Sequence, residues 1–288
     1  MTVSAVQARP APAPVRVPAV ASIAVRPLLE SADAHGEVLG VSSHAVWIRT
    51  GDDVVVVSTR DATRLPNAIE IAALAAVDPF GSIEHRERVT VGPALIAFEG
   101  LTVKVVRWWD PRPILGPTCS RALATRLRGL PSSVPDIEAQ RLRFALSTES
   151  PPALCSAATA LLGRGPGLTP EGDDYLAGAL AATRTLGSSL GAGGALVMLD
   201  DAGAQLAAAA RTRTTAFSAA LIRCALRGEV AAPAAAFLRA LAGRGDVSEA
   251  HRNLLSVGHS SGPALVAGIV LGAESLNQLH VTPNGGFQ

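Results

Sequence analysis

Residues able to do chemistry are densest between Gly163 and Gly178, where glycines and prolines surround two adjacent aspartates. We expect Thr169 to cap a helix whose first residue is Pro170, because threonine accepts hydrogen bonds from free amides and proline fits the first turn. The unpaired amides at that helix start favour a small anion, and glycine allows it close to the backbone. The predicted anion-binding residues of this stretch are Arg164, Gly165, Gly167, Thr169 and Gly172.

Asp173 and Asp174 fall near the start of the same predicted helix. The helix dipole favours the charged form of both carboxyls, so we expect a low pKa for each. Such a pair can hold a divalent cation such as Mg²⁺, or bind an amide or ammonium group. We predict both as catalytic residues, with the alternative that they only complement the helix dipole, as acidic residues at helix starts commonly do.

A second loop, Gly258 to Gly268, repeats the spacing of the first, with glycine, an apolar residue, alanine and glycine in the same order. Two similar helix entries can converge on one pocket, to which this loop would bring backbone amides, hydroxyls and an imidazole. Its predicted binding residues are His259, Ser260, Ser261 and Gly262. Small residues four apart, such as Gly178 with Ala182 and Gly268 with Gly272, also predict two closely packed helices.

A third polar element adds the hydroxyls of Thr214, Thr215 and Ser218 to an alanine-rich stretch. Thr214 and Ser218 share a helical face with Arg211, where hydroxyls can hydrogen-bond a substrate. They can equally cap a helix or bond the carbonyls of their own turn. We include all three hydroxyl residues among the predicted binding residues.

Two kinds of element must position these residues. β-branched runs at 38–41, 45–50, 54–59, 89–91, 95–98 and 101–108 predict the strands of a mostly antiparallel β-sheet or small barrel. After Pro117, helices are predicted near 119–129, 135–147, 152–162, 170–187, 194–210, 214–227, 231–242, 246–256 and 263–276. The sequence therefore predicts an α+β fold, with a disordered leader (1–19), a β-rich domain (20–115), an all-helical domain carrying the glycine-loop site (116–280) and a flexible tail (281–288).

Composition excludes several classes of protein. Lys and Arg number 25 against 24 Asp and Glu, so the chain lacks the broad positive field that binds nucleic acid or an anionic membrane. No run of about 18 consecutive apolar residues predicts a membrane span. The three cysteines are widely spaced and predict neither a disulfide framework nor a zinc motif, so we expect a cytoplasmic protein with no certain cofactor, Mg²⁺ being the one candidate.

Taken in order, the three polar elements resemble a family described as a domain of unknown function and typified by AllH, a subunit of the oxamate carbamoyltransferase of allantoin breakdown. The motifs that carry the resemblance are Gly165-Pro-Gly-Leu-Thr-Pro-x-Gly-Asp-Asp-Tyr-Leu-Ala-Gly178, Thr214-Thr-x-x-Ser218 and Gly258-His-Ser-Ser-Gly262. The resemblance covers the helical half well and the β half loosely. Two positions depart from the family pattern: Glu171 replaces a small hydroxyl residue, and Ala264 replaces a frequent aspartate.

The resemblance implies a subunit of a multisubunit carbamoyltransferase of ureide nitrogen metabolism, assembled with FdrA-like partner subunits. In such an enzyme a carbamoyl group passes between oxalurate and phosphate, and the bound anion would be carbamoyl phosphate, phosphate or oxamate. Two alternatives stay open. The chain is a noncatalytic interaction or regulatory subunit of an FdrA-type complex, or it is a stand-alone Mg²⁺-dependent phosphotransferase or hydrolase of small ureides or amides, with metal at Asp173 and Asp174.

Overall fold

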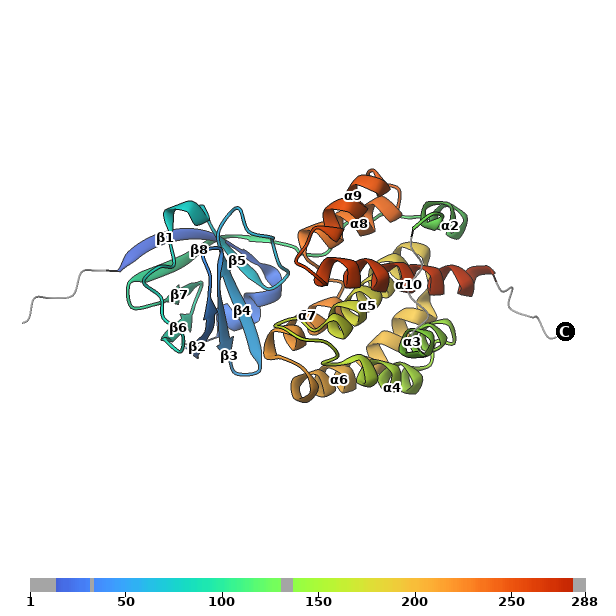
Figure 1. The fold of residues 1–288 in the computed structure, drawn as a ribbon, viewed down its shortest axis with the longest axis horizontal. Helices are drawn as coiled ribbons and strands as arrows, with labels where there is room; N and C mark the ends of the chain where they lie inside the picture. Colours follow the sequence, from blue (N-terminus) through green and yellow to red (C-terminus); the bar gives the residue numbers. More distant parts are fainter. Residues whose placement is uncertain (1–13, 32–33, 131–136, 282–288) are drawn as a thin grey trace, which may run out of the picture.

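The computed structural model describes residues 14–31, 34–130 and 137–281. Eight strands form a closed barrel in the N-terminal half, and the helices that follow form a second body beside it (Figure 1). The predicted α+β fold, with a β part that precedes a helical part, is confirmed. No helix in the described part of the chain is long and apolar enough to cross a membrane.

The barrel strands are β1 (Val15–Ser22), β2 (Ala34–Val41), β3 (Ala45–Thr50), β4 (Asp53–Ser58), β5 (Ala68–Ile71), β6 (Arg88–Gly92), β7 (Leu95–Ala97) and β8 (Leu101–Trp109). Their order around the barrel is β1-β5-β4-β3-β2-β6-β7-β8. Neighbouring strands are antiparallel except for two parallel pairs, β1 with β8 and β4 with β5. Three short helical segments, η1 (Ile23–Val25), α1 (Arg26–Glu30) and η2 (Ala75–Val77), lie between strands.

β4 shows why apolar and polar residues alternate only weakly along the sequence of the N-terminal half. Val55 and Val57 belong to the core inside the barrel, whereas Val54 and Val56 belong to a separate core shared with the helical body. A strand buried on both faces has no polar face to present, so its sequence is a continuous run of valines. The same run therefore encodes both the barrel and its contact with the helices.

The predicted leader is wrong for residues 15–19, because β1 begins at Val15. β1 closes the barrel by pairing with β8 on one side and β5 on the other, and its inward residues Ala19 and Ala21 are buried. These pairings join segments far apart in the chain. The leader is predicted from its local, proline-rich composition, which contains no information about such distant partners. The rest of the predicted leader up to residue 13, and the predicted tail from residue 282, lie outside the described residues.

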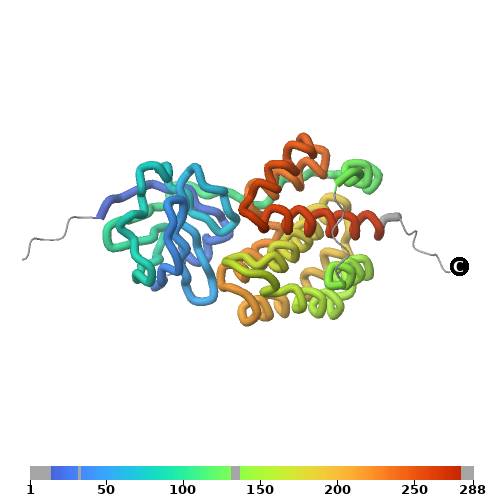
Figure 2. The backbone as a smooth tube through the Cα atoms, in the orientation of Figure 1, coloured from blue at the N-terminus to red at the C-terminus, as the bar shows by residue number. Residues whose placement is uncertain are grey.

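In the described part of the helical half, all nine predicted helices are present within a few residues of their expected bounds. They are α2 (Ser120–Leu127), α3 (Ile137–Ser147), α4 (Pro151–Leu161), α5 (Glu171–Leu190), α6 (Gly193–Arg213), α7 (Ala216–Leu226), α8 (Ala232–Leu241), α9 (Val247–Leu255) and α10 (Ser261–Val281). α10 crosses the whole helical body with α5 beside it (Figures 1 and 2).

Glycines let α5 and α10 approach closely. A Cβ at Gly178 would lie 2.5 Å from the Leu265 carbonyl oxygen, and a Cβ at Gly268 would lie 2.0 Å from that of Tyr175. Both distances are far below van der Waals contact, so only glycine fits at these positions. The predicted close packing of two helices is confirmed, and it fixes the starts of α5 and α10 next to each other.

A small third core joins the barrel to α7. Phe217 and Ala220 of α7 pack against Val54, Val56 and other outward-facing barrel residues. The Trp47 ring of β3 meets Phe217 edge to face, with ring centroids 6.3 Å apart. Arg223 of α7 also forms an ion pair with Asp53 at the start of β4. The start of α7, with its cluster of hydroxyls, is therefore held directly against the barrel.

Candidate functional site

Asp173 ties the glycine loop to the residues that precede α7. Its side chain is 2% exposed; one carboxylate oxygen accepts from the Gly163 amide at 2.8 Å, and the other accepts from the Thr214 hydroxyl. Gly163 has a φ of +75°, and a Cβ there would lie 2.3 Å from the Arg213 carbonyl oxygen. Both oxygens of Asp173 are thus occupied in holding two chain segments together.

The hydroxyls before and within α7 bind the same loop. Thr215 caps α7 by accepting from the Ser218 amide at 3.0 Å, and it donates to the Leu168 carbonyl at 2.7 Å. The Ser218 hydroxyl lies 3.4 Å from the same carbonyl oxygen. Thr215 therefore has the capping role that was the alternative to substrate binding, whereas Ser218 also reaches a cavity described below.

The loop before α10 completes the convergence of the three polar elements. The Thr169 and Ser261 hydroxyls are 3.0 Å apart and hydrogen-bonded. Thr169 was predicted to cap α5, and this is wrong: Pro170 occupies the cap position and α5 begins at Glu171. The physical reason is tertiary, since the Thr169 hydroxyl bonds a residue 92 positions away rather than its own helix.

These elements enclose a cavity of about 180 Å³ between the helical body and the barrel, which we call the interface cavity. Its polar lining residues are Thr169, Asp173, Asp174, Ser218, Glu229 and Ser261. The barrel contributes Trp47, Leu65 and Pro66 to the wall. These three barrel residues are not among the predicted site residues, because no local pattern around them points to a site in the helical half.

Asp174 is the least compensated carboxyl of the interface cavity. Its side chain is 5% exposed, and its Oδ2 atom has no hydrogen-bond partner in the described part of the chain. Burial raises the pKa of Asp174 to about 6; hydrogen bonds from Ser261 and Thr169 act in the opposite direction, and the charge of Asp173 adds to the rise. The expected low pKa is wrong for this residue because loss of water outweighs the helix dipole.

A carboxyl with a pKa of about 6 can exchange a proton near neutral pH. Asp173 and Asp174 are neighbours in sequence but differ in what their oxygens do. One positions the loop, and the other presents a free acceptor atom beside a cavity. The geometry therefore favours Asp174 as the residue that meets a ligand.

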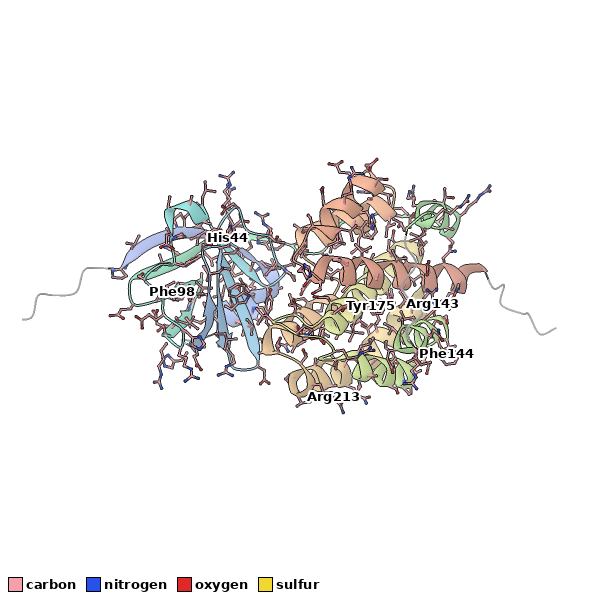
Figure 3. All side chains as sticks on the ribbon, in the orientation of Figure 1. His44, Phe98, Arg143, Phe144, Tyr175 and Arg213 are labelled. Atoms are coloured by element: carbon pink, nitrogen blue, oxygen red, sulfur yellow. The ribbon has the colours of Figure 1, made fainter. Side chains whose placement is uncertain are left out.

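Three other predicted residues of the first loop, Arg164, Gly165 and Gly172, line a different cavity on the other side of α5. This Arg164 cavity has a volume of about 500 Å³ and is lined by residues that include Arg164, Gly165, Glu171, Gly172, Tyr175 and Ala264. Tyr175 is labelled within the helical body in Figure 3. Positions 171, 172 and 175 share one side of a helix and 173, 174 and 177 another, which explains why the predicted site residues divide between two cavities.

Glycine at 172 is required by packing. A Cβ there would lie 2.3 Å from the Leu161 carbonyl oxygen, and the Gly172 amide donates to the Arg164 carbonyl at 2.9 Å. That amide is therefore not free for an anion. Both departures from the family pattern, Glu171 and Ala264, lie on the Arg164 cavity.

Six predicted binding residues line neither cavity: Thr214 and Thr215, whose hydrogen bonds are described above, and Gly167, His259, Ser260 and Gly262. His259 and Ser260 are exposed at the tip of the second loop. Gly262 packs against α9, where a Cβ would lie 2.3 Å from the Leu254 carbonyl oxygen, and Gly167 has a φ of +97° in an open turn. These glycines shape the two loops, and the two exposed residues remain available on the surface.

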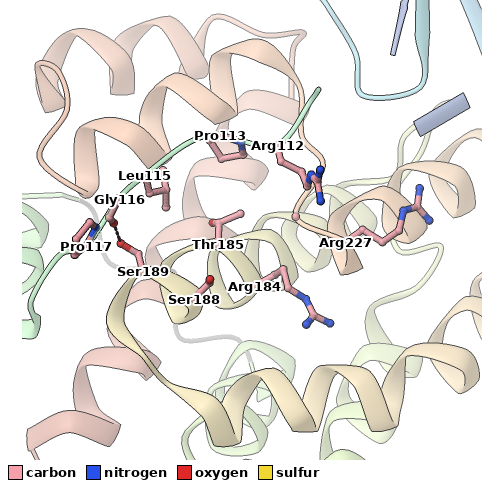
Figure 4. Close-up of a pocket in the computed structure, with 11 residues that line it drawn as sticks. Arg112, Pro113, Leu115, Gly116, Pro117, Arg184, Thr185, Ser188, Ser189 and Arg227 are labelled. Carbon is pink, nitrogen blue, oxygen red and sulfur yellow. Dashed lines mark hydrogen bonds between the residues drawn. The ribbon is translucent and has the colours of Figure 1, made fainter. Parts of the chain in front are cut away.

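A further cavity of about 520 Å³ lies where the segment after the barrel crosses α5, and contains none of the predicted site residues (Figure 4). Its arginines Arg112, Arg184 and Arg227 are each paired with a carboxylate, those of Asp110, Asp200 and Glu229. Their charges are compensated within the chain. Among the described residues there is also no group of three or more His, Cys, Asp or Glu side chains placed to hold a metal ion.

Comparison with known proteins connects this site with a family. The model of the family described as oxamate carbamoyltransferase subunit AllH matches residues 161–273. That stretch runs from the end of α4 into α10 and contains every helical residue proposed above for the interface cavity, whereas the barrel lies outside it. The resemblance inferred from the three motifs is confirmed. No solved structure matches the chain.

Proposed function

We propose that this chain is a subunit of a carbamoyltransferase of the oxamate type, active in the cytoplasm in ureide nitrogen metabolism together with FdrA-like partner subunits. The family match over residues 161–273 supports the class of enzyme. The observation that carries the assignment of the site is the buried Asp174 carboxyl, whose Oδ2 atom lacks a partner and whose residue lines the interface cavity. Asp174 is the proposed proton acceptor, and Asp173 is a positioning residue.

In the proposed reaction the amide nitrogen of oxamate attacks the carbonyl carbon of carbamoyl phosphate. The new C–N bond forms, the C–O bond to phosphate breaks, and the proton lost by nitrogen passes to Asp174, while phosphate leaves as the second product. In the reverse direction a phosphate oxygen attacks oxalurate and Asp174 returns the proton to the departing nitrogen. A pKa of about 6 suits both directions, because the group is readily charged and readily protonated near neutral pH.

The lining of the cavity favours the amide end of the substrates over the phosphoryl end. Asp173 and Asp174 contribute two carboxyls to its wall, beside Glu229, whose charge Arg227 compensates, and negative charge at short range repels a phosphate dianion. We therefore assign the phosphoryl end to a position outside the interface cavity, at the contact with the FdrA-like partners. The hydroxyls of Ser218 and Ser261 are the proposed neutral donors to the substrate within it.

The test is carbamoyl transfer from carbamoyl phosphate to oxamate by the reconstituted complex. Asp174→Asn should lower kcat by roughly 10² to 10⁴, the usual contribution of a general base. The matched control is Asp201→Asn, since Asp201 is exposed on α6. Full activity of the Asp174→Asn complex would remove this residue from the chemistry and favour a noncatalytic role for the chain.

A further inference from the structure

Two residues that line the interface cavity, one from each half of the chain, carry a buried polar atom without a partner among the described residues. One is the Asp174 Oδ2 atom of α5, an acceptor when ionised; the other is the Trp47 Nε1–H group of β3, a donor. Neither has a hydrogen-bond partner among the described residues. A buried polar group left unpaired costs about 1–3 kcal/mol, so a ligand that pairs both recovers that cost on binding.

We propose that the barrel completes the substrate site and that Trp47 donates its indole N–H to the carbonyl oxygen of a primary amide whose N–H group binds Asp174. The H₂N–C=O group combines an N–H donor and a carbonyl acceptor in one small unit, and oxamate and carbamoyl phosphate both contain it. The inference rests on the proposed function for the identity of these ligands. It adds a specificity residue from the barrel, outside the stretch matched by the family model.

Size and charge determine which end of the ligand enters. At about 180 Å³ the cavity is smaller than the ~300–1,000 Å³ of pockets for drug-sized molecules, so it fits a small group. Leu65 and Phe217 give the wall an apolar character, and the carboxylate of Asp173 repels an anion. The neutral amide therefore enters first, and the carboxylate of oxamate stays at the mouth.

The packing around Trp47 holds its indole N–H donor in a fixed position. Its neighbours Val46 and Ile48 point into the barrel core, so Trp47 projects from the outer face toward α7. Phe217 holds the indole edge to face at an interplanar angle of 79°. An aromatic ring held by another ring has little freedom to move, and a pre-positioned donor binds its acceptor at a low entropic cost.

The experiment measures binding of oxamate and oxalate to the full-length chain by calorimetry near neutral pH. Oxalate keeps the size of oxamate but replaces its amide by a carboxylate. Trp47→Phe removes only the N–H and retains an aromatic ring. The matched control is Trp109→Phe, because the Trp109 Nε1 atom is also buried without a partner but does not line the cavity.

We expect oxamate to bind more tightly than oxalate, and Trp47→Phe to weaken oxamate binding about five- to tenfold, the effect of one lost hydrogen bond. Trp109→Phe should bind oxamate like the wild type. The free protein loses no hydrogen bond in Trp47→Phe, because the removed N–H group has no partner among the described residues. We therefore expect no fall in its melting temperature from this cause. The assignment would be overturned if Trp47→Phe bound oxamate as tightly as the wild type, or if Trp109→Phe lost as much oxamate affinity as Trp47→Phe. It would also be overturned if the wild type bound oxalate as tightly as oxamate, or did not bind oxamate at all.

This outcome is independent of the activity test. If Asp174→Asn abolishes carbamoyl transfer while Trp47→Phe binds oxamate normally, the proposed function stands and the role of Trp47 falls. If the complex shows no carbamoyl transfer while Trp47→Phe weakens amide binding, the site stands and the reaction assigned to it falls.

Discussion

Replacing Asp174 by asparagine should stabilise the fold while it removes activity. Asparagine has nearly the shape of a protonated aspartate and carries no charge. Burial raises the pKa of Asp174 from 3.8 to about 6, which means that the folded protein disfavours the charged form. A difference of roughly 2 pKa units corresponds to about 3 kcal/mol at 1.36 kcal/mol per unit, and we expect about 2–3 kcal/mol because the fold relaxes around the charge.

The effect should depend on pH in a defined direction. Between about pH 4 and 6 the folded protein keeps its proton on Asp174 while the unfolded chain loses it, so the stability of the wild type falls as the pH rises through this window. Above about pH 6 the penalty is fully present. The Asp174→Asn variant lacks this penalty, so it should be the more stable protein near neutral pH and should converge with the wild type below about pH 4.

Urea denaturation at a series of pH values measures this difference directly. Asp173→Asn is the informative contrast, because both oxygens of Asp173 accept hydrogen bonds, and their loss should destabilise the protein by about 1–3 kcal/mol. Asp201→Asn, at an exposed position, should leave the curve unchanged. An Asp174→Asn protein that is less stable than the wild type near neutral pH, or whose difference does not vary with pH, would refute the reasoning.

Carbamoyl transfer by the wild-type complex should decline as the pH falls below about 6, as Asp174 becomes protonated, and a pH–rate profile flat through this range would contradict its role as base. Gly268→Ala should lower the free energy of unfolding by about 1–3 kcal/mol or more, because the added methyl group forces α5 and α10 apart. Gly203→Ala, in open space on α6, should raise it by about 0.5–1 kcal/mol. Chemical denaturation compares the two variants, and similar free energies of unfolding would contradict the close packing of α5 and α10. Mg²⁺ should not raise the melting temperature measured by calorimetry, because both oxygens of Asp173 are occupied by hydrogen bonds; a clear rise would revive the metal hypothesis.

Most of the helical half could be predicted from the sequence because helix signals are local. Glycines that end apolar-periodic stretches mark several of the boundaries that the structure shows. β1 and β5 were missed for the opposite reason. β1 contains Pro18 and follows a proline-rich stretch, β5 has four residues, and both owe their strand conformation to partners distant in the chain.

The sequence by itself determined that three polar motifs stand at helix starts and that Gly178 and Gly268 allow two helices to touch. Only the tertiary structure decided what each residue does there. Asp173 and Asp174 have the same side chain, yet hydrogen bonds from Gly163 and Thr214 satisfy the first, while burial leaves the second with an unpaired oxygen and a raised pKa. Desolvation depends on every group packed around an atom, including groups distant in the chain, and local sequence does not contain that information.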